Sequence, residues 1–412
     1  MRSVVIINTG TEILLGDVAD AHLAFIAREI FQFGLQVEEQ RIIPDGAAIG
    51  VAIRDVFARA EIVFVTGGLG PTTDDVTREI VAELLQLELI EDTTVRAAIR
   101  DRLSIRHIPV TKRVWRQAQV PVGAEILPNE GGTAPGLYLP ANVSSAVASP
   151  HLFLLPGPPR ELQPIFRQSV APILRRITAG LHPPAMRKFQ LAVMGESIVE
   201  KKLGAKILAI PGIELGYRSR PGEVEVRVSG RPEAVEAAER IIQSELADAI
   251  FTTEDETLAA VVVRLLSKQG ETLAVAESCT GGLLAHQVTD VPGASKVFLG
   301  GYVTYSNEEK IRALGVAASS IERFGAVSEE VALEMAEGTR RGAQATHSIA
   351  TTGIAGPSGG TVEKPVGTAF IAISSANYVP ICRKFFLPSD RETFKQLLAQ
   401  NAFDLLRRRL LA

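Results

Sequence analysis

Short runs of β-branched residues alternate with amphipathic stretches in the first and last thirds of this 412-residue chain. In the first third, residues 4–7 and 62–65 are predicted strands, and residues 21–33 and 160–177 are predicted helices. Strands that alternate with helices form parallel sheets, which bind ligands at the carboxyl ends of their strands. The alternation therefore predicts α/β domains with ligand sites in the loops that follow strands.

A different pattern occupies residues 179–253, where strands predicted at 189–194 and 224–228 precede a helix at 232–249. This segment has the size of a KH domain but lacks the Gly-x-x-Gly loop with which KH domains clamp RNA. A spacer or dimer role is the better interpretation. We expect two three-layer α/β domains, 1–178 and 254–412, joined by a small α+β (KH-like) domain at 179–253.

Charge and cysteine content narrow the class of protein. The net charge of -4 and an aromatic content of 5% argue against a nucleic-acid partner. Two cysteines are too few for a disulfide framework, the apolar run at residues 4–7 is too short for a signal peptide, and no segment approaches the ~20 apolar residues that span a bilayer. We expect a cytoplasmic protein without a membrane partner.

One loop pattern, Thr-Gly-x-x-Gly-Pro, follows two predicted strands. It occurs as Thr66-Gly67-Gly68-Leu69-Gly70-Pro71 and as Thr352-Gly353-Ile354-Ala355-Gly356-Pro357. Glycines let the backbone turn sharply and approach a ligand, and a following helix offers N–H groups to a phosphate. Ordinary tight turns have the same composition, so the neighbouring residues must decide between the two interpretations.

Hydroxyl and acidic residues follow the first loop, in the order Thr72-Thr73-Asp74-Asp75. Carboxylates beside a phosphate-type loop suit a hydrated Mg²⁺ on a pyrophosphate. The alternative is that Asp74 caps a helix that begins at Asp75. Three further polar loops lie around residues 10–12, 131–136 and 156–161, and together with the first they predict one crevice.

A hydroxyl at a strand-to-helix turn marks the last third. Ser278 follows the strand predicted at 272–276 and precedes Gly281 and Gly282, an arrangement that fits a nucleophile with oxyanion-binding N–H groups. Lys310 would serve as its base only with a lowered pKa. Spacing alone leaves other interpretations open: Ser278 as a helix cap, Tyr305 as a core edge residue, Lys310 as a solvated residue, and Cys279 as a rival nucleophile.

These motifs together resemble full-length members of the CinA competence/damage-inducible family. The first third is similar to the molybdopterin-binding-like domain of that family through Gly10-Thr11-Glu12-Ile13-Leu14-Leu15-Gly16 and the run from Thr66 to Asp75. The last third is similar to its nicotinamide-nucleotide amidase domain through Ala276-Glu277-Ser278-Cys279-Thr280-Gly281-Gly282, Thr304-Tyr305-Ser306-Asn307 and Gly353-Ile354-Ala355-Gly356-Pro357.

The resemblance implies two hydrolytic activities on small nucleotides. The C-terminal domain would convert nicotinamide mononucleotide to nicotinate mononucleotide and ammonia, without a cofactor. The N-terminal domain would cleave ADP-ribose to AMP and ribose 5-phosphate with a divalent metal, which we expect to be Mg²⁺. A homodimer is also expected from the family.

The resemblance further implies residue roles. In the amidase domain the expected catalytic residues are Ser278, Lys310, Tyr305 and Thr352, and the expected substrate-binding residues are Glu277, Thr280, Gly281, Gly282, Gly353, Gly356 and Arg391. In the N-terminal domain the expected substrate-binding residues are Thr11, Gly67, Gly68, Gly70, Thr72, Gly132, Thr133, Gly157, Pro158 and Glu161, and the expected metal ligands are Glu12, Asp74 and Asp75.

The sequence departs from the family at one point, where Asp20-Ala21-His22 replaces the usual Asp-Thr-Asn. Because this hydroxyl and this amide are lost, the family's ligand contacts are not carried over to these positions, and the sequence supports the N-terminal activity less strongly than the C-terminal one. Two other functions remain open: a non-catalytic nucleotide or pterin binder in the first third, since fold does not fix reaction, and a competence-related DNA-handling protein. The acidic charge balance argues against the latter.

Overall fold

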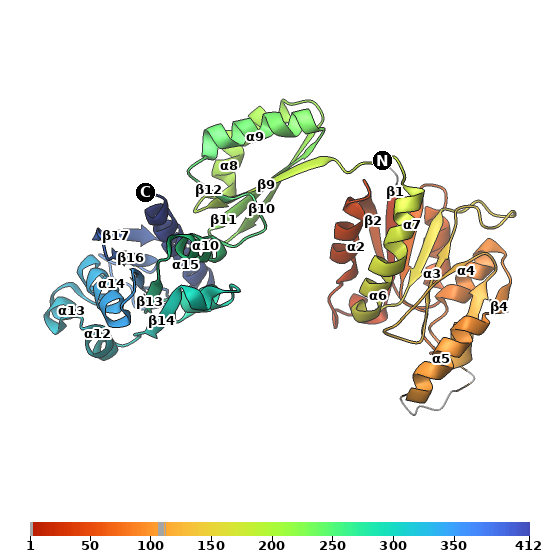
Figure 1. Cartoon of the computed structure of the whole chain (residues 1–412), viewed down its shortest axis with the longest axis horizontal. Coiled ribbons are helices and arrows are strands. Elements are labelled where there is room, and N and C mark those ends of the chain that lie inside the picture. The colour runs from red at the N-terminus through yellow and green to blue at the C-terminus, as the bar shows by residue number, and fades with distance from the viewer. Residues whose placement is uncertain (1–2, 106–110, 112) are drawn as a thin grey trace. The chain divides into compact units, whose positions relative to one another are not determined.

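The structure is a computed structural model that describes residues 3–105, 111 and 113–412. The chain divides into two compact units, Met1–Pro183 and Pro184–Ala412 (Figure 1). Each unit is built around its own sheets.

A six-stranded sheet forms the first unit, in the order β2-β1-β3-β8-β7-β6. Four of its strands are parallel, namely β1 (Ser3–Thr9), β2 (Gln36–Ile43), β3 (Ile62–Thr66) and β8 (His151–Leu155), while β7 (Gly136–Leu139) and β6 (Glu125–Leu127) run antiparallel. A separate pair, β4 (Leu89–Glu91) and β5 (Gln119–Pro121), lies outside this sheet. The carboxyl ends of β1, β3 and β8 therefore lie side by side.

Helices cover both faces of this sheet because β1 is apolar on both sides. Val4 and Ile6 pack with the helices α2 (His22–Phe31), α6 (Pro159–Ile165) and α7 (Ala171–Ile177). A π-helical turn at Phe166–Val170 joins α6 to α7. Val5 and Ile7 pack with α3 (Ala48–Val56), α4 (Thr77–Leu85) and α5 (Thr93–Ile105). Two short turns of helix, α1 (Thr11–Leu14) and η1 (Val114–Ala118), complete this three-layer domain (Figure 1).

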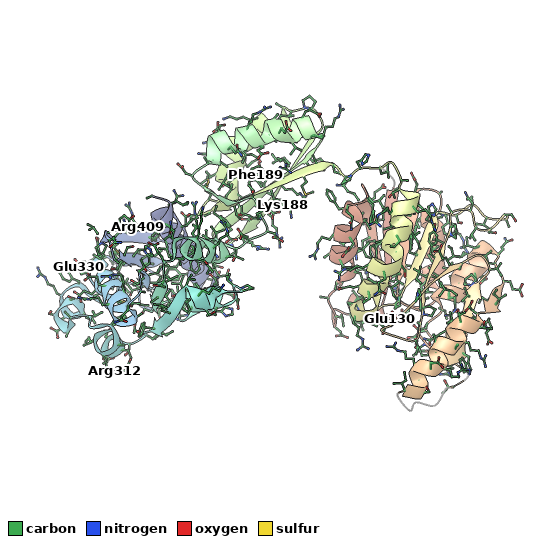
Figure 2. The ribbon with its side chains drawn as sticks, in the orientation of Figure 1. Glu130, Lys188, Phe189, Arg312, Glu330 and Arg409 are labelled. Carbon is green, nitrogen blue, oxygen red and sulfur yellow. The ribbon has the colours of Figure 1, made fainter. Side chains whose placement is uncertain are left out.

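The second unit begins with a small antiparallel sheet in the order β10-β11-β9-β12. Its strands are β9 (Ala185–Ala192), β10 (Ile213–Arg220), β11 (Glu223–Gly230) and β12 (Ile250–Thr252), and its helices are α8 (Glu196–Leu208) and α9 (Pro232–Leu246). Phe189 of β9 is fully buried in a core shared with Val199 of α8 and Val235 of α9 (Figure 2). This is the α+β module that the sequence predicts.

A five-stranded sheet, β14-β13-β15-β16-β17, forms the rest of the second unit. The parallel strands are β13 (Leu273–Glu277), β14 (Phe298–Val303) and β15 (His347–Gly353), followed by antiparallel β16 (Thr368–Ser375) and β17 (Tyr378–Phe386). One face packs against α10 (Leu258–Gln269), α11 (Leu283–Thr289) and α15 (Arg391–Leu411). The other packs against α12 (Asn307–Leu314), α13 (Ala318–Phe324) and α14 (Glu329–Ala343), and η3 (Ala294–Lys296) precedes β14.

The predicted fold class, two three-layer α/β domains joined by a small α+β domain, is confirmed. The predicted boundary between 253 and 254 falls inside the second compact unit, because the two sheets of that unit pack on shared residues. Arg407 of α15 donates to the carbonyl oxygens of Asp248 and Ile250, and Phe251 lies in the same core as α10 and α15. The division into three domains stays a prediction.

Candidate active sites

Ser278 lies where three parallel strands of the second unit end. It follows β13 directly, and its backbone N–H donates to Thr351 O of β15 at 3.0 Å. On the other side, Thr304 N after β14 donates to Glu277 O at 2.9 Å. Residues that are far apart in sequence are thus brought to one sheet edge, as the alternation predicts.

Lys310 contacts Ser278 from α12. Its Nζ lies 3.2 Å from Ser278 Oγ and donates to Thr304 O at 2.9 Å, with the Tyr305 carbonyl at 3.4 Å. The lysine is 1% exposed, and burial lowers its pKa because the charged form is poorly solvated. The interpretation of Lys310 as a solvated helix residue is therefore wrong.

Glu277 caps the start of helix α11. Its buried carboxylate accepts hydrogen bonds from the backbone N–H groups of Gly282, Leu284 and Ala285 at 2.9 to 3.1 Å. These are donors that a helix N-terminus otherwise leaves unsatisfied. Because Glu277 caps this helix, the interpretation of Ser278 as the helix cap is wrong. The N–H group of Gly282 already donates to Glu277.

The turn after Ser278 keeps other donors free. Gly281 N donates to Ser278 O at 3.2 Å, whereas the N–H groups of Cys279 and Thr280 donate to no other residue in the described part of the chain. Cys279 is buried, and burial raises the pKa of its thiol to about 12. A thiol that stays protonated is a poor nucleophile, which favours Ser278 over Cys279.

Tyr305 and Arg391 form an exposed wall beside this turn. Arg391, the first residue of α15, donates from Nη2 to the Tyr305 hydroxyl at 2.7 Å and from Nη1 to Gly356 O at 2.9 Å. Tyr305 is 60% exposed, so it is not a core edge residue. The predicted residues Tyr305, Gly356 and Arg391 are brought together.

The threonines of the predicted site are occupied by structural hydrogen bonds. Thr280 Oγ1 pairs with Thr351 Oγ1 at 2.8 Å, and Thr352 Oγ1 donates to Ala326 O at 2.8 Å. Gly353 packs closely on Thr368 and Ala369 of the neighbouring strand. A direct catalytic role for Thr352 therefore has no support in this geometry.

In the first unit, a cavity of about 460 Å³ lies at the strand ends and is lined by loops. All but two of the predicted N-terminal site residues line it, namely Glu12, Gly67, Gly68, Gly70, Asp74, Asp75, Gly132, Thr133, Gly157, Pro158 and Glu161. Thr11 and Thr72 are hydrogen-bonded to carboxylates that line the cavity. Thr11 N and Oγ1 donate to Asp45, and Thr72 N donates to Asp75. The crevice that the loops predict is thus present.

Gly67 and Gly68 are required by the backbone of the first loop. Both have positive φ, of 96° and 67°, and a Cβ at either position would collide with Thr9 or Thr77. Thr77 also holds the loop, since its Oγ1 donates to Gly67 O at 3.0 Å. The close approach that requires these glycines is to Thr9 and Thr77 of the chain itself, so the choice between a tight turn and a ligand loop stays open.

Asp74 and Asp75 share one hydroxyl donor and do not cap a helix. Thr72 Oγ1 lies 2.5 Å from Asp74 Oδ1 and also contacts Asp75 Oδ2, and this hydrogen bond lowers the pKa of Asp74. Helix α4 begins at Thr77, and its N-cap residue Val76 supplies no side-chain hydrogen bond. The interpretation of Asp74 as a helix cap is therefore wrong.

The chemistry of these acids suits a metal in part. Within residues 3–105, 111 and 113–412 no three His, Cys, Asp or Glu side chains are close enough to hold an ion together. The adjacent carboxylates of Asp74 and Asp75 fit Mg²⁺, which is often bound through one or two carboxylates and completes its shell with water and substrate oxygens. The predicted three-ligand set with Glu12 does not fit.

Asn129 shapes the loop opposite the acids. Its Oδ1 accepts from the N–H groups of Gly131 and Gly132, and its Nδ2 donates to Glu161 Oε2 at 2.8 Å. The Glu161 carboxylate lies so close to Gly132 that a Cβ there would overlap it. Glu161 therefore holds the loop in place.

His22 ties the strand ends of the first unit together. Its Nε2 lies 2.7 Å from Gly157 O, and its Nδ1 lies 3.0 Å from Thr66 Oγ1 and 3.3 Å from Asn8 Nδ2. Asp20 completes the network by accepting from Asn8 and from His22 N. The buried His22 side chain therefore contacts both the end of β3, at Thr66, and the loop after β8, at Gly157.

Sequence reasoning missed four residues that line the N-terminal cavity: Thr9, Asp45, Arg102 and Gln117. Thr9 and Gln117 are buried and carry side-chain oxygens without a partner among the described residues. Asp45 follows β2, so its strand-end position was a usable signal. Gln117 lies in a 3-10 turn that precedes β5 and Arg102 lies in α5, so neither follows a strand and neither gave such a signal.

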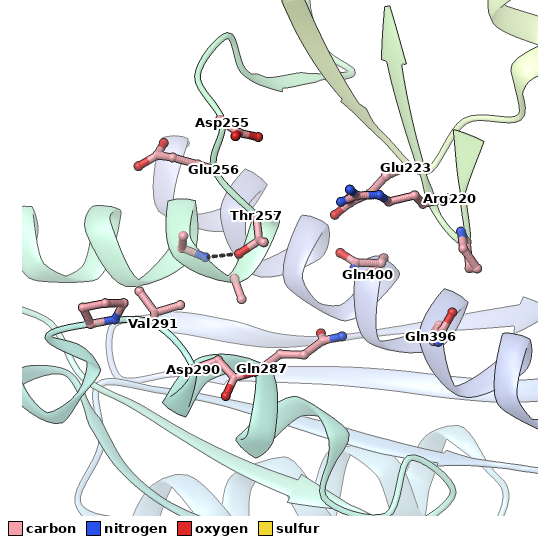
Figure 3. Close-up of a pocket in the computed structure, with 14 residues that line it drawn as sticks. Arg220, Glu223, Asp255, Glu256, Thr257, Gln287, Asp290, Val291, Gln396 and Gln400 are labelled. Atoms are coloured by element: carbon pink, nitrogen blue, oxygen red, sulfur yellow. Dashed lines mark hydrogen bonds between the residues drawn. The ribbon is translucent and has the colours of Figure 1, made fainter. Parts of the chain in front are cut away.

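The second unit holds another cavity, of about 510 Å³, between the β10–β11 turn and the helices α10, α11 and α15 (Figure 3). Its polar lining includes Arg220, Glu223, Gln287 and Gln400, and burial raises the pKa of Glu223. No site residue predicted from the sequence lies in it.

No helix in the described part of the chain is long and apolar enough to cross a membrane.

Comparison with known proteins finds a family match for the first part of the chain and another for the last part. The CinA C-terminal domain family matches residues 255–410, and the family described as "Probable molybdopterin binding domain" matches residues 5–176. A CinA-like protein of Akkermansia muciniphila is 40% identical over 96% of this chain and 95% of its own length. A putative competence-damage inducible protein of Moorella thermoacetica is 40% identical over 98% of each.

The chain is also similar to part of a solved structure. A competence/damage inducible protein from Agrobacterium tumefaciens is 33% identical, covers 39% of this chain and all of its own, and superposes with a TM-score of 0.37.

Proposed function

The chain belongs to the CinA family, and from that premise we propose that it is a bifunctional hydrolase of small pyridine-derived nucleotides. The C-terminal domain deamidates nicotinamide mononucleotide to nicotinate mononucleotide and ammonia. The N-terminal domain hydrolyses ADP-ribose to AMP and ribose 5-phosphate with a divalent metal. The observation that carries the first activity is the buried contact between Lys310 Nζ and Ser278 Oγ.

The amidase reaction needs a base next to the nucleophile. In the neutral form of Lys310, the carbonyl oxygens of Thr304 and Tyr305 would accept two of its hydrogens, which would leave its lone pair for the proton of the Ser278 hydroxyl. Ser278 Oγ attacks the carboxamide carbon while its proton passes to Lys310 Nζ. Lys310 then returns this proton to the nitrogen as the C–N bond breaks, so that ammonia leaves and the acyl group remains as an ester of Ser278.

Water completes the cycle by the same route. It attacks the ester carbonyl while Lys310 takes its proton, and Ser278 leaves as an alkoxide that recovers the proton from Lys310. The product carries a carboxylate where the substrate carried a carboxamide. The negative oxygen of each tetrahedral intermediate would be bound by the free N–H groups of Cys279 and Thr280, which lie in the turn after the nucleophile.

The N-terminal activity is supported by the loop-lined cavity and its paired acids. Asp74 and Asp75 would hold a divalent ion, which when bound neutralises charge on the pyrophosphate. The glycine loops would offer backbone N–H groups to the phosphates, and Arg102 and Arg160 would add positive charge at the cavity wall.

A second candidate for the N-terminal domain is nucleotide or pterin binding without catalysis. The observation that favours it is the lack, among the described residues, of a three-ligand metal site. The two candidates differ in product formation, because only a hydrolase releases AMP.

Product analysis of the full chain tests both activities. Nicotinamide mononucleotide and ADP-ribose are supplied separately with Mg²⁺ or Mn²⁺, and ammonia, nicotinate mononucleotide and AMP are quantified. We expect all three products. Absence of ammonia and nicotinate mononucleotide would contradict the amidase assignment, and tight ADP-ribose binding without AMP would favour the binding role.

A further inference from the structure

Lys395 is a second cation beside the Ser278 turn. It lies one helical turn after Arg391 on α15, so both side chains project from the same face of the helix. Its Nζ is 3.7 Å from the position that a Cβ on Gly281 would occupy, and Gly281 is bonded to Ser278 through its N–H. The ammonium of Lys395 therefore lies at the edge of the proposed amidase site.

No group of the described chain neutralises this ammonium. Lys395 is half-buried and has no hydrogen-bond or ion-pair partner among the described residues. The nearest carboxylate in the turn sequence, Glu277, is taken up by three backbone N–H groups. A partly buried side chain whose cation has no counter-charge offers its three ammonium donors and its charge to an anionic ligand.

Side chains, not the helix terminus, are left to bind such an anion. Asp390 caps α15 and accepts from the N–H groups of Glu392 and Thr393 at 3.0 Å, so these donors are occupied. Lys310 is engaged with Ser278, and Arg391 is engaged with Tyr305 and Gly356. Lys395 is the cation of this group whose donors are all free within the described residues.

We propose that Lys395 binds the phosphate of the nucleotide substrate and makes the amidase selective for phosphorylated substrates. The inference rests on the proposed amidase function and adds a specificity-determining residue to it. The ammonium would donate to the phosphate oxygens, while Arg391 orders the adjacent wall. A nucleoside without phosphate would gain nothing from Lys395.

The test compares two substrates in the full-length protein. Wild type, Lys395→Met and Lys395→Arg are assayed with nicotinamide mononucleotide and with nicotinamide riboside, which lacks the phosphate. We expect Lys395→Met to lower kcat/KM for the mononucleotide by about 10- to 100-fold, the effect of a lost charge-assisted hydrogen bond. Activity on the riboside should stay unchanged, and Lys395→Arg should retain most activity on the mononucleotide.

A matched control is Lys268→Met, which removes an exposed lysine near the end of α10 and should change neither activity. A Lys395→Met variant that loses both activities equally would show a structural role and overturn the inference, as would one that keeps full activity on the mononucleotide.

Binding of inorganic phosphate separates this inference from the proposed function. If wild type fails to deamidate the mononucleotide, the proposed function fails, and phosphate titration of wild type and Lys395→Met by calorimetry still decides the anion site. Weaker phosphate binding by the variant supports the inference. Equal binding, or no binding to wild type, overturns it.

Discussion

The two candidate sites use similar loops at strand ends but opposite surroundings. In the second unit, Lys310 and Ser278 are 1% and 9% exposed and contact each other directly. In the first unit, Asp74 and Asp75 lie on the rim of an open cavity and share Thr72. Burial prepares a base from the chain itself, whereas exposed carboxylates need an ion from solution.

The largest effect should come from breaking the buried pair. Ser278→Ala and Lys310→Arg should each lower amidase turnover by at least about 10³-fold, because arginine keeps the charge but does not act as a base near neutral pH. Ammonia release measures this effect, and AMP release from ADP-ribose should be unchanged in both variants.

Cys279→Ala is the matched control for the pair, and it should keep amidase turnover close to wild type. Loss of turnover in Cys279→Ala, together with activity in Ser278→Ala, would reassign the nucleophile.

The next largest effect should be a loss of stability when the Glu277 carboxylate, which caps α11 beside the buried site, is removed. Glu277→Ala leaves three N–H groups at the start of α11 without their acceptor and should lower the unfolding free energy of the second unit by roughly 3 kcal/mol. Urea unfolding followed by circular dichroism measures the loss. Glu277→Gln keeps one carbonyl acceptor and should lose less; equal losses would contradict the capping role.

Changing the open site should affect only the other activity. Asp75→Asn should lower metal-dependent AMP release by about 10²-fold and leave ammonia release unchanged. Asp255→Asn, in the second unit, serves as the control. Normal AMP release by Asp75→Asn over a full metal titration would remove Asp75 from the site.

A pH profile distinguishes the two environments. The neutral form of Lys310 is the active base, and burial lowers its pKa, so amidase kcat/KM should rise by about tenfold per pH unit up to that lowered pKa and then level off. The exposed acids of the first unit should produce no such rise above neutrality. An amidase profile that falls with pH over this range would contradict Lys310 as the base.

The smallest effect is expected at His22. His22→Asn restores the family's usual residue but shortens the link from Thr66 to Gly157 O, and should raise the KM for ADP-ribose by only about two- to tenfold. His22→Ala should raise it further. Identical KM values for the three proteins would show that the loops hold their positions without this side chain.

Strand-end loops are the part of both sites that the sequence could predict. Periodicity located β3 and β13, and glycine content marked the loops after them, so the sequence placed Gly67, Gly68 and Ser278 at strand ends, where the structure has them. The burial of Lys310 could not be predicted, because it depends on how α12 folds back over the end of β14. Helices α13 and α14 were not predicted either, because no element was assigned to the segment between the strands β14 and β15.

Residues placed by tertiary packing also escaped prediction. Gln117 and Arg102 reach the N-terminal cavity from helical turns, and Lys395 reaches Gly281 from α15. Conversely, Glu277 and Thr352 stand in the right motifs but are consumed by structural hydrogen bonds. A motif places a residue near a site, and only the hydrogen-bond partners decide its role.

Metal chelation tests the contrast between the two sites most directly. Full-length wild type is given nicotinamide mononucleotide and ADP-ribose in one mixture, before and after excess EDTA, and ammonia and AMP are measured together. We expect EDTA to stop AMP release and to leave ammonia release unchanged. Loss of both products on chelation, or survival of both, would contradict the proposed difference between the two sites.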